Sequence, residues 1–352
     1  MSPPLGPFRK IGVWQTAFLG DAVLTLPLIA ALKTAWPGAD IHFFVRAGLE
    51  PLFAAQPELS AVHGFAKRGS DRSLAAAARL GLSLRGQGFD LWISPHTSLR
   101  SAFIAALSGA PVRLGYDRPW LSALAYTHTV SRDFDRLEEI ERLMRLLLPL
   151  GLPLDLDPVL PTPRLVLPGP DLEAARAWRA GRPGPLLGLH PGSTWPTKQW
   201  PLQFFADIIA RASASGVATA VFGGPGPETD LAARIIAQAK PGPGPILNLA
   251  GTLSLPGLAA HLGLVDAYLT NDSGPMHLAW AQDTPVVALF GPTVRALGFY
   301  PRGPGSTVLE LDLPCRPCGL HGHAACPEGH HACMLTLTPD LVWPVLAAKL
   351  IR

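Results

Sequence analysis

The sequence predicts an α/β protein made of two doubly wound domains, each a parallel sheet with helices on both faces. Three observations predict this fold. The chain has 352 residues, more than one compact core usually takes. Hydrophobic residues make up 48% of it and charged residues 16%, a balance typical of a folded, well-buried protein. Apolar, β-rich runs alternate with helical patterns through both halves, and such alternation indicates parallel sheets.

In the first half, short β-rich runs and longer helical patterns follow one another. The predicted strands are Ile11–Trp14, Ile41–Val45 and Asp90–Ile93. The predicted helices are Asp21–Ala35, Ser98–Leu107 and Arg136–Leu148, with Pro149 ending the last. The next stretch, Gly151 to Pro170, is rich in proline and has no helical period. We therefore interpret it as the linker between the domains.

The same pattern restarts after this linker. The predicted strands are Leu186–Leu189, Val217–Phe222, Ile246–Leu249, Val265–Thr270 and Val286–Phe290. The predicted helices are Leu202–Ala212, Glu228–Ala239, Pro275–Gln282 and Pro339–Ile351. We expect domains at 1–160 and 161–338 that face each other across a cleft, and a C-terminal helix within 339–352 that packs back on the first domain. Ligands of such sheets bind at the carboxyl ends of the strands, so we examine the residues that follow each strand.

Charge excludes one class of partner and leaves another open. The first 150 residues hold 16 Lys and Arg against 12 Asp and Glu, whereas the remainder holds 13 against 14. This basic excess suits an anionic partner, although ordinary surface arginines explain it equally well. No dense basic run with interleaved aromatic residues is present in the sequence, which argues against nucleic acid.

The N-terminal segment is the most hydrophobic part of the chain. Its apolar stretch continues without a small-residue cleavage site, so it is a poor signal peptide. Gly20, Asp21 and Pro27 interrupt it, so it is also a poor membrane span. A strand followed by a buried helix fits better, and we expect a cytoplasmic protein.

The first candidate site is the stretch FLGDAV, Phe18 to Val23. Gly20 allows the backbone to approach a ligand closely. Asp21 stands at the start of a predicted helix, where the helix N-terminus favours its ionised form. It is therefore either a helix cap or a general base that projects into the cleft.

The second candidate site is GLHPGSTWPTKQWP, Gly188 to Pro201, which follows a predicted strand. A Gly-Ser-Thr loop with a single cation, Lys198, suits phosphate binding through hydroxyl groups, backbone N–H groups and one charge. It does not have the spacing of a P-loop. A solvated lysine is the alternative.

The third candidate is FGGPGPETD, Phe222 to Asp230, where glycines follow a strand and a helix begins near Glu228. The GxGxxG fingerprint of dinucleotide-binding folds is absent from it. Glu228 either accepts hydrogen bonds from ribose hydroxyls or occupies the first helical turn because of the helix dipole.

The fourth candidate is YLTNDSGPMHLAWA, Tyr268 to Ala281, a predicted strand, turn and helix. Ser273 and Gly274 would place free N–H groups at a helix N-terminus, which is an anion site. Asp272 would repel an anion and more plausibly accepts hydrogen bonds from a polyol. His277 lies one helical turn beyond Ser273. A capping turn with a core histidine is the alternative.

Four cysteines gather near the C-terminus: Cys315, Cys318, Cys326 and Cys333. The CxxC pair followed by two more cysteines is compatible with a structural zinc ion or an iron–sulfur cluster. The spacing of the second pair matches no standard zinc module, so reduced cysteines that pack a C-terminal loop are the alternative.

Together these segments resemble glycosyltransferase family 9, the ADP-heptose:lipopolysaccharide heptosyltransferases, and most closely their heptosyltransferase II branch. The most specific match is TNDSGPMHLAWAQDTPVVALFGPT, from Thr270 to Thr293. The further matches are FLGDAVLTLPLIAALK, VRLGY, HPGSTWPTKQWP and the cysteine tail, so the resemblance covers nearly the whole chain. Pro275 stands where the family usually has leucine, and Trp195-Pro196-Thr197 differs from the residues often seen in that loop.

The resemblance implies a GT-B fold and an inverting transfer of heptose from ADP-heptose to the lipopolysaccharide inner core, without a cofactor or a catalytic metal ion. The acceptor would be an anionic lipid at the inner membrane face, and the cytoplasmic enzyme would associate with that membrane peripherally. The implied roles are a general base at Asp21 beside Gly20, diphosphate binding by Lys198, Ser193, Thr194, Ser273 and Gly274, ribose binding by Glu228, sugar binding by Asp272, and support from His277.

Three alternatives remain open from the residues. The first is a related GT-B enzyme that uses another nucleotide sugar or acceptor. The second is a nucleotide-sugar epimerase, which would need a further catalytic carboxylate that the sequence does not display. The third is a binding module without catalysis, which would not require Asp21.

Overall fold

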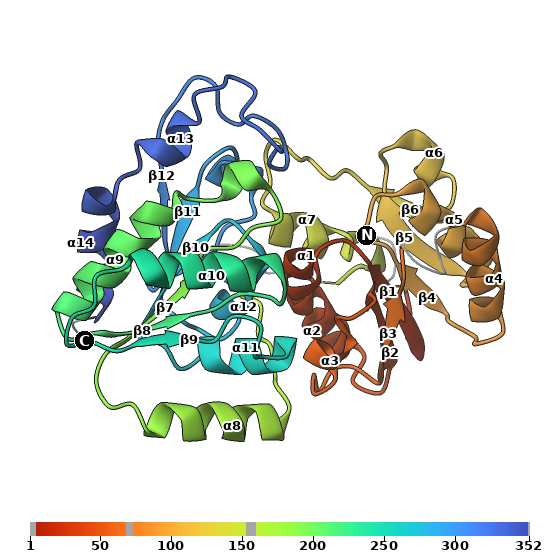
Figure 1. Ribbon diagram of the computed structural model, residues 1–352. Helices are drawn as coiled ribbons and strands as arrows, with labels where there is room; N and C mark the ends of the chain where they lie inside the picture. The colour runs from red at the N-terminus through yellow and green to blue at the C-terminus, as the bar shows by residue number, and fades with distance from the viewer. Residues whose placement is uncertain (1–4, 68–72, 153–159, 351–352) are drawn as a thin grey trace. The chain divides into compact units, whose positions relative to one another are not determined.

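The computed structural model describes residues 5–67, 73–152 and 160–350 and divides the chain into two compact units, Met1–Val166 and Leu167–Arg352. Each unit contains one six-stranded parallel sheet, shown in Figure 1. The two predicted doubly wound domains are therefore confirmed. The division falls after Val166 rather than after residue 160. Residues 153–159 of the predicted linker lie outside the described part of the chain.

The sheet of the first unit has the strand order β3-β2-β1-β4-β5-β6. Its strands are β1 (Lys10–Gln15), β2 (Asp40–Arg46), β3 (Ala61–Phe65), β4 (Leu91–Ile93), β5 (Val112–Tyr116) and β6 (His128–Val130). Its helices are α1 (Leu19–Leu24), α2 (Leu26–Ala35), α3 (Glu50–Phe53), α4 (Leu74–Arg85), α5 (Leu99–Leu107), α6 (Trp120–Ala123) and α7 (Glu139–Arg145), followed by the 3-10 turn η1 (Leu148–Leu150).

The helix predicted over Asp21–Ala35 is two helices. α1 ends at Leu24, and Thr25 caps both its end and the start of α2. Pro27 occupies the first turn of α2, where its missing N–H costs nothing, so the chain restarts a helix there instead of continuing one.

The core of the first unit is rich in aromatic residues. Trp14 from β1, Phe44 from β2 and Trp92 from β4 pack on one another with ring centroids 5.1 to 5.9 Å apart. All three are buried, and large aromatic side chains contribute most of the apolar area that a core removes from water. This cluster packs β1, β2 and β4 together, and the first candidate site follows β1.

The sheet of the second unit has the order β12-β11-β10-β7-β8-β9. Its strands are β7 (Leu186–His190), β8 (Ala218–Val221), β9 (Ile246–Asn248), β10 (Ala267–Asn271), β11 (Val286–Phe290) and β12 (Thr307–Glu310). Its helices are α8 (Gly169–Ala180), α9 (Leu202–Ala214), α10 (Pro227–Gln238), α11 (Leu255–Leu262), α12 (Gly274–Trp280), α13 (Ala332–Leu335) and α14 (Pro339–Leu350), with 3-10 turns η2 (Pro196–Lys198) and η3 (Arg295–Leu297).

The two sheets share one topology. Counted from its own first strand, each sheet places strands 1 and 4 together at the centre, which pairs β1 with β4 and β7 with β10. The chain reverses its direction of travel across the sheet at these central pairs. In doubly wound folds, ligands bind beyond the carboxyl ends of the strands at this point.

The C-terminal helix α14 packs on residues of the second unit. Val342, Leu346 and Leu350 of α14 are buried in the hydrophobic core of the second unit, with residues of α9, rather than in a core of the first. Arg211 of α9 also pairs with Asp340, at 2.6 Å. The buried apolar face of α14 therefore belongs to the second domain.

No helix within residues 5–67, 73–152 and 160–350 is both long enough and apolar enough to cross a membrane.

Candidate active site

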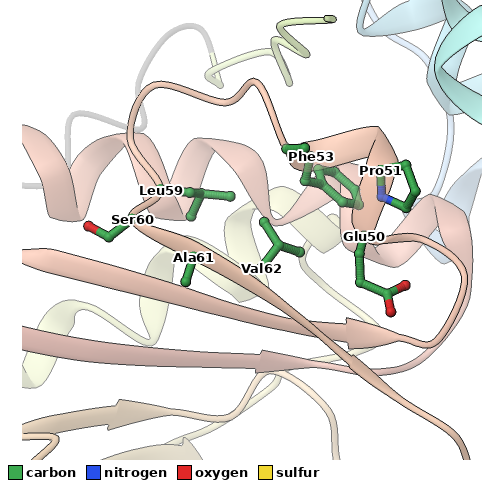
Figure 2. A pocket seen from close by; sticks show the side chains of 8 residues that line it. Glu50, Pro51, Phe53, Leu59, Ser60, Ala61 and Val62 are labelled. Carbon is green, nitrogen blue, oxygen red and sulfur yellow. The ribbon is translucent and has the colours of Figure 1, made fainter.

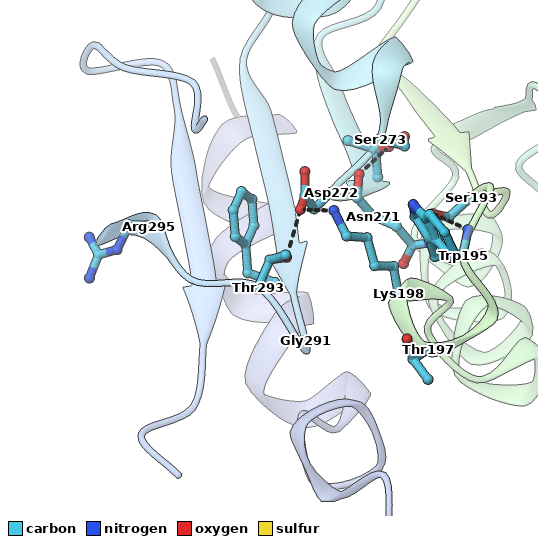
Figure 3. A network of polar contacts seen from close by, with 12 residues as sticks. Ser193, Trp195, Thr197, Lys198, Asn271, Asp272, Ser273, Gly291, Thr293 and Arg295 are labelled. Carbon is cyan, nitrogen blue, oxygen red and sulfur yellow. Dashed lines mark hydrogen bonds and ion pairs between the residues drawn. The ribbon is translucent and has the colours of Figure 1, made fainter. Parts of the chain in front are cut away.

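The centre of the second sheet carries a buried ion pair between two of the predicted residues. Lys198 Nζ, in the turn after β7, donates to Asp272 Oδ2, directly after β10, at 2.5 Å. The two residues are only 9% and 8% exposed. Thr293, which follows β11, donates its hydroxyl to the same carboxylate oxygen at 2.6 Å. Figure 3 shows the lysine and the threonine approaching Asp272 from different segments.

Asn271 fixes the loop that carries Lys198. Its side-chain amide donates to Pro191 O at 2.8 Å, and its Oδ1 accepts from Trp200 N at 3.1 Å. These two bonds tie both ends of the lysine loop to the end of β10. Because Asn271 is fully buried, the bonds lie in a low-dielectric environment where they are strong.

The turn after Asp272 leads into α12, with Ser273 in the N-cap position and Gly274 as the first helical residue. Ser273 makes no side-chain cap bond to the helix, and its hydroxyl lies 3.4 Å from that of Thr270. Pro275 occupies the first turn, as its missing N–H favours. The predicted strand–turn–helix is therefore confirmed.

His277 lies behind this turn and is 5% exposed. Burial lowers its pKa to about 4, with the nearby Asp272 acting to raise it and Lys198 to lower it further. Its Nδ1 has no hydrogen-bond partner among the described residues. The side chain is therefore a neutral imidazole next to the ion pair, and not a cation.

Glu228 stands in the first turn of α10 and makes two contacts. Its Oε2 accepts from Gly224 N at 2.6 Å and lies 3.3 Å from His190 Nε2 at the end of β7. The bond to His190 lowers the pKa of the carboxyl. A Cβ atom on Gly192 would lie 2.2 Å from Glu228 Oε1, so a larger residue there would displace the Glu228 carboxylate.

Ser193 and Thr194 lie in the same loop as Lys198. Gln199 donates its amide to Ser193 O at 2.9 Å, and the Ser193 hydroxyl accepts a long bond of 3.4 Å from Trp195 N. Thr194 is exposed at the surface of the second unit. Ser193, Thr194 and Lys198 thus share one loop, and the anion site expected there stays a prediction.

In the first unit, Asp21 is the third residue of α1, just after β1, and Gly20 beside it is buried. Asp21 Oδ2 accepts from Phe18 N at 3.0 Å, so the carboxylate caps its own helix. Burial raises the pKa of Asp21 to about 6, and the negative charge of Glu139 adds to this effect. The Phe18 bond and Arg132 act in the opposite direction.

Glu139 is buried and forms ion pairs with two arginines. It is 1% exposed and accepts from Arg132 and from Arg142, each at 2.9 Å. Arg142 is fully buried and also donates to Phe134 O at 2.6 Å. This paired network holds a negative charge near Asp21, which is the arrangement that raises the pKa of a carboxyl group.

Lys67 and Arg132 lie within electrostatic reach of Asp21. Lys67, after β3, lies 3.1 Å from His96 Nε2, and His96 Nδ1 lies 2.7 Å from the Ser101 hydroxyl. Burial and the charges of Arg100 and Arg46 lower the pKa of Lys67 to about 8, while Asp21 acts to raise it. Burial and Lys67 lower the pKa of His96 to about 3.

One concave pocket of the first unit lies away from these groups. It is lined by apolar side chains of α3 and β3 together with Glu50 and Ser60, as Figure 2 shows. None of the predicted site residues lines it. The pocket therefore does not define the candidate active site.

The structure thus groups the predicted residues by domain. Lys198, Asp272, Ser273 and Gly274 meet at the centre of the second sheet with His277 behind them, and Glu228 lies at the next strand end. Asp21 and Gly20 stand at the centre of the first sheet. Two partners were not predicted, namely His190 for Glu228 and Thr293 for Asp272. His190 ends β7, and Thr293 lies three residues after β11. Their positions at strand ends were the sequence signal that could have identified them.

The four cysteines carry free thiols, and Cys333 is buried. Burial raises the pKa of Cys333 to about 11, and the other three thiols contribute in the same direction. In the part of the chain that the structure describes, no three histidine, cysteine or acidic side chains are arranged to hold a metal ion.

Comparison with known proteins gives a consistent family. The model of glycosyltransferase family 9 (heptosyltransferase) matches residues 77–325. Lipopolysaccharide heptosyltransferase 2 of Escherichia coli is 28% identical over 97% of this chain and 99% of its own length. Lipooligosaccharide heptosyltransferase 2 of Campylobacter jejuni is 32% identical over 45% of this chain. The match covers 48% of that relative, so this chain spans about half of the relative's length.

Two solved structures share the fold. A glycosyl transferase family 9 protein from Veillonella parvula superposes with a TM-score of 0.85 at 22% identity, over 99% of both chains. ADP-heptose heptosyltransferase II of Escherichia coli gives a TM-score of 0.80 at 24% identity, over 97% of this chain and 98% of the other. These likenesses confirm the predicted GT-B fold. Because the family model covers well over half of the sequence, this chain belongs to glycosyltransferase family 9, the heptosyltransferase family.

Proposed function

We propose that this chain transfers a heptose from ADP-heptose to an anionic acceptor of the lipopolysaccharide inner core, with inversion at the anomeric carbon. The observation that carries the proposal is the buried Lys198–Asp272 pair at the centre of the second sheet. It places a cation and a hydroxyl-accepting carboxylate side by side where doubly wound folds bind nucleotides. The names of the relatives supply the sugar and the acceptor.

The second domain would bind the donor. Lys198 would neutralise the charge that develops on the ADP leaving group, with hydroxyl and N–H groups of Ser193, Thr194, Ser273 and Gly274 around the diphosphate. Lys198 and Thr293 both donate to Oδ2 of Asp272, so Oδ1 would accept hydroxyls of the sugar. Glu228 would hold the ribose while His190 fixes its carboxylate.

Buried, neutral His277 suits a supporting role. Its side chain lies close enough to Asp272 and Lys198 for their charges to act on it, yet burial keeps it uncharged. It therefore supports the pair without adding a second cation.

The first domain would supply the general base. Asp21 would take the proton of the acceptor hydroxyl. At the same time the acceptor oxygen would form a bond to the anomeric carbon of the heptose, and the bond from that carbon to the ADP oxygen would break. A pKa of about 6 leaves the carboxylate ionised at neutral pH and makes it a stronger base than an ordinary aspartate. The helix N-terminus on which Asp21 stands favours the ionised form.

The acceptor would bind near this base. The charges of Arg46 and Arg100 act on Lys67, and both Lys67 and Arg132 interact with the charge of Asp21. A group of cations of this kind attracts phosphate and carboxylate groups, which a lipopolysaccharide core carries. An acceptor in the inner membrane face would bring the enzyme to that surface, where anionic lipids also attract basic residues.

A ligand panel tests the proposed donor. We expect ADP-heptose and ADP to raise the melting temperature of the full chain, because ligands that bind only the folded state stabilise it by mass action. UDP- and GDP-sugars serve as controls, and ADP-glucose separates recognition of the sugar from recognition of the nucleotide. Incubation with ADP-heptose and lipopolysaccharide core should then release ADP. A chain stabilised only by a UDP- or GDP-sugar would overturn the proposal.

The pH dependence of transfer reports on Asp21. Because the reaction needs the carboxylate and its pKa is about 6, kcat/KM should fall about tenfold per pH unit below about pH 6. An aspartate with the ordinary pKa of 3.8 would keep the rate level to about pH 5. The measurement is kcat/KM from pH 4.5 to 8, with circular dichroism at each pH to confirm folding.

Glu139→Gln provides the matched control for this profile. It removes the negative charge that helps to raise the pKa of Asp21, so the acidic limb should move to lower pH. If the fall of kcat/KM at acidic pH occurs at the same pH in folded Glu139→Gln as in the wild type, a group other than Asp21 causes that fall.

A further inference from the structure

The cysteine-rich segment, residues 315–333, contacts the donor site through Thr197. Thr197 N donates to His323 O at 3.2 Å, and the Thr197 hydroxyl donates to the same oxygen at 3.0 Å. The hydroxyl in turn accepts from His323 N at 2.7 Å. Thr197 is 5% exposed, so this two-way contact is shielded from water.

A second histidine of the segment holds the same residue. His331 Nε2 donates to Thr197 O at 2.8 Å. Both the hydroxyl and the two backbone polar groups of Thr197 therefore bond to the cysteine-rich segment. Within the described residues the 3-10 turn η2, which contains Thr197 and Lys198, has no side-chain cap of its own.

The segment also packs directly on the neighbours of Thr197. A Cβ atom on Gly322 would lie 2.5 Å from Trp195 Cβ and 3.1 Å from Lys198 Cγ. The backbone at Gly322 therefore lies against the stem of the lysine, and a larger residue would displace it. His321 stacks on Trp195 with an interplanar angle of 8° and a centroid distance of 6.3 Å.

His321 brings the segment within electrostatic reach of the ion pair. Burial lowers the pKa of His321, Lys198 lowers it further, and Asp272 acts to raise it. The segment thus reaches the cation and the carboxylate of the donor site, although its cysteines take no part in the proposed reaction.

We propose that the cysteine-rich segment is a positioning element of the donor site. It holds Thr197 through His323 and His331, and thereby sets the position of the Lys198 ammonium opposite Asp272. The segment fixes the side chain that would meet the donor diphosphate, and this role rests on the proposed function. Thr197, His323 and His331 are positioning residues and not catalytic ones.

A matched pair of variants at Thr197 tests this inference. Thr197→Val keeps the shape of the side chain but removes both hydroxyl bonds to His323, whereas Thr197→Ser keeps the hydroxyl. The dissociation constant of ADP, measured by calorimetry on the full chain, should rise about tenfold in Thr197→Val. The backbone N–H of His323 then loses the hydroxyl of Thr197, next to Lys198 in the sequence, that accepts its hydrogen bond. Thr197→Ser should stay within about twofold of the wild type.

Further variants separate positioning from general destabilisation. His331→Ala removes the bond to Thr197 O and should weaken ADP binding in the same direction, whereas His330→Ala changes an exposed histidine of the same segment and should leave it unchanged. The KM for ADP-heptose should rise more than kcat falls. Folded Thr197→Val and His331→Ala proteins that bind ADP like the wild type would overturn the inference. A wild-type chain that does not bind ADP would instead overturn the proposed function.

Discussion

Replacing Asp21 with asparagine should lower kcat for heptose transfer about 10³-fold, the size of effect expected when a general base is removed. Asparagine still offers an oxygen to Phe18 N, so the helix cap is retained and the fold should be unaffected. The KM for ADP-heptose should stay close to the wild-type value, because the predicted donor residues all lie in the other domain. Steady-state kinetics with varied donor and acceptor measure both quantities.

Asp21→Glu is a useful companion to this variant. It keeps a carboxylate but lengthens the side chain by one methylene, so it should retain more activity than asparagine while misplacing the base. Transfer by Asp21→Asn at a rate near that of the wild type would rule out the general-base role. A large rise in the KM for ADP-heptose would instead indicate a structural role for the carboxylate.

Replacing Lys198 with alanine should have two large effects. The first is on stability, because the Asp272 carboxylate would remain buried beside the neutral Thr293 hydroxyl without the cation that pairs with its charge. Removing one partner of a buried ion pair costs about 3–5 kcal/mol. The second is on catalysis, where loss of the cation that stabilises the leaving group should lower kcat/KM about 10³-fold. Urea unfolding and steady-state kinetics measure the two effects.

A double variant separates these two effects. Lys198→Met with Asp272→Leu replaces the ion pair by apolar groups of similar size, which should restore most of the lost stability. Activity should remain absent, since neither the cation nor the sugar-binding carboxylate is present. If Lys198→Ala and the double variant were equally stable, the pair would not behave as a buried charge pair.

The residues at strand ends could be predicted from the sequence because each lies in a short local pattern. The run from Tyr268 to Ala281 changes from strand to helix within a few residues, and the structure has that change where it was expected. The pairing of Lys198 with Asp272 could not be predicted in this way. The two residues are separated by 74 positions, and only the adjacency of β7 and β10 brings them together.

Three of the edge strands were harder to predict for a different reason. β3, β6 and β12 lie at the edges of their sheets, are only partly buried and were not predicted, whereas the edge strand β9 was predicted as Ile246–Leu249. A strand with solvent on more than one side needs no strong apolar pattern, so its sequence resembles that of a loop. The domain that buries α14 could not be predicted from the sequence either, because an apolar helix face does not identify the sheet that will bury it.

The central pairing of the second sheet has a consequence for how the protein folds. β7 and β10 are neighbours in the sheet, but the whole of β8, α9, β9 and the helices between them lies between these strands in the chain. Closing so long a loop is slow, because its entropy is lost before the contact is gained. During refolding, helical structure should therefore return before the Lys198–Asp272 pair forms, and the capacity to bind ADP should be among the last properties to recover.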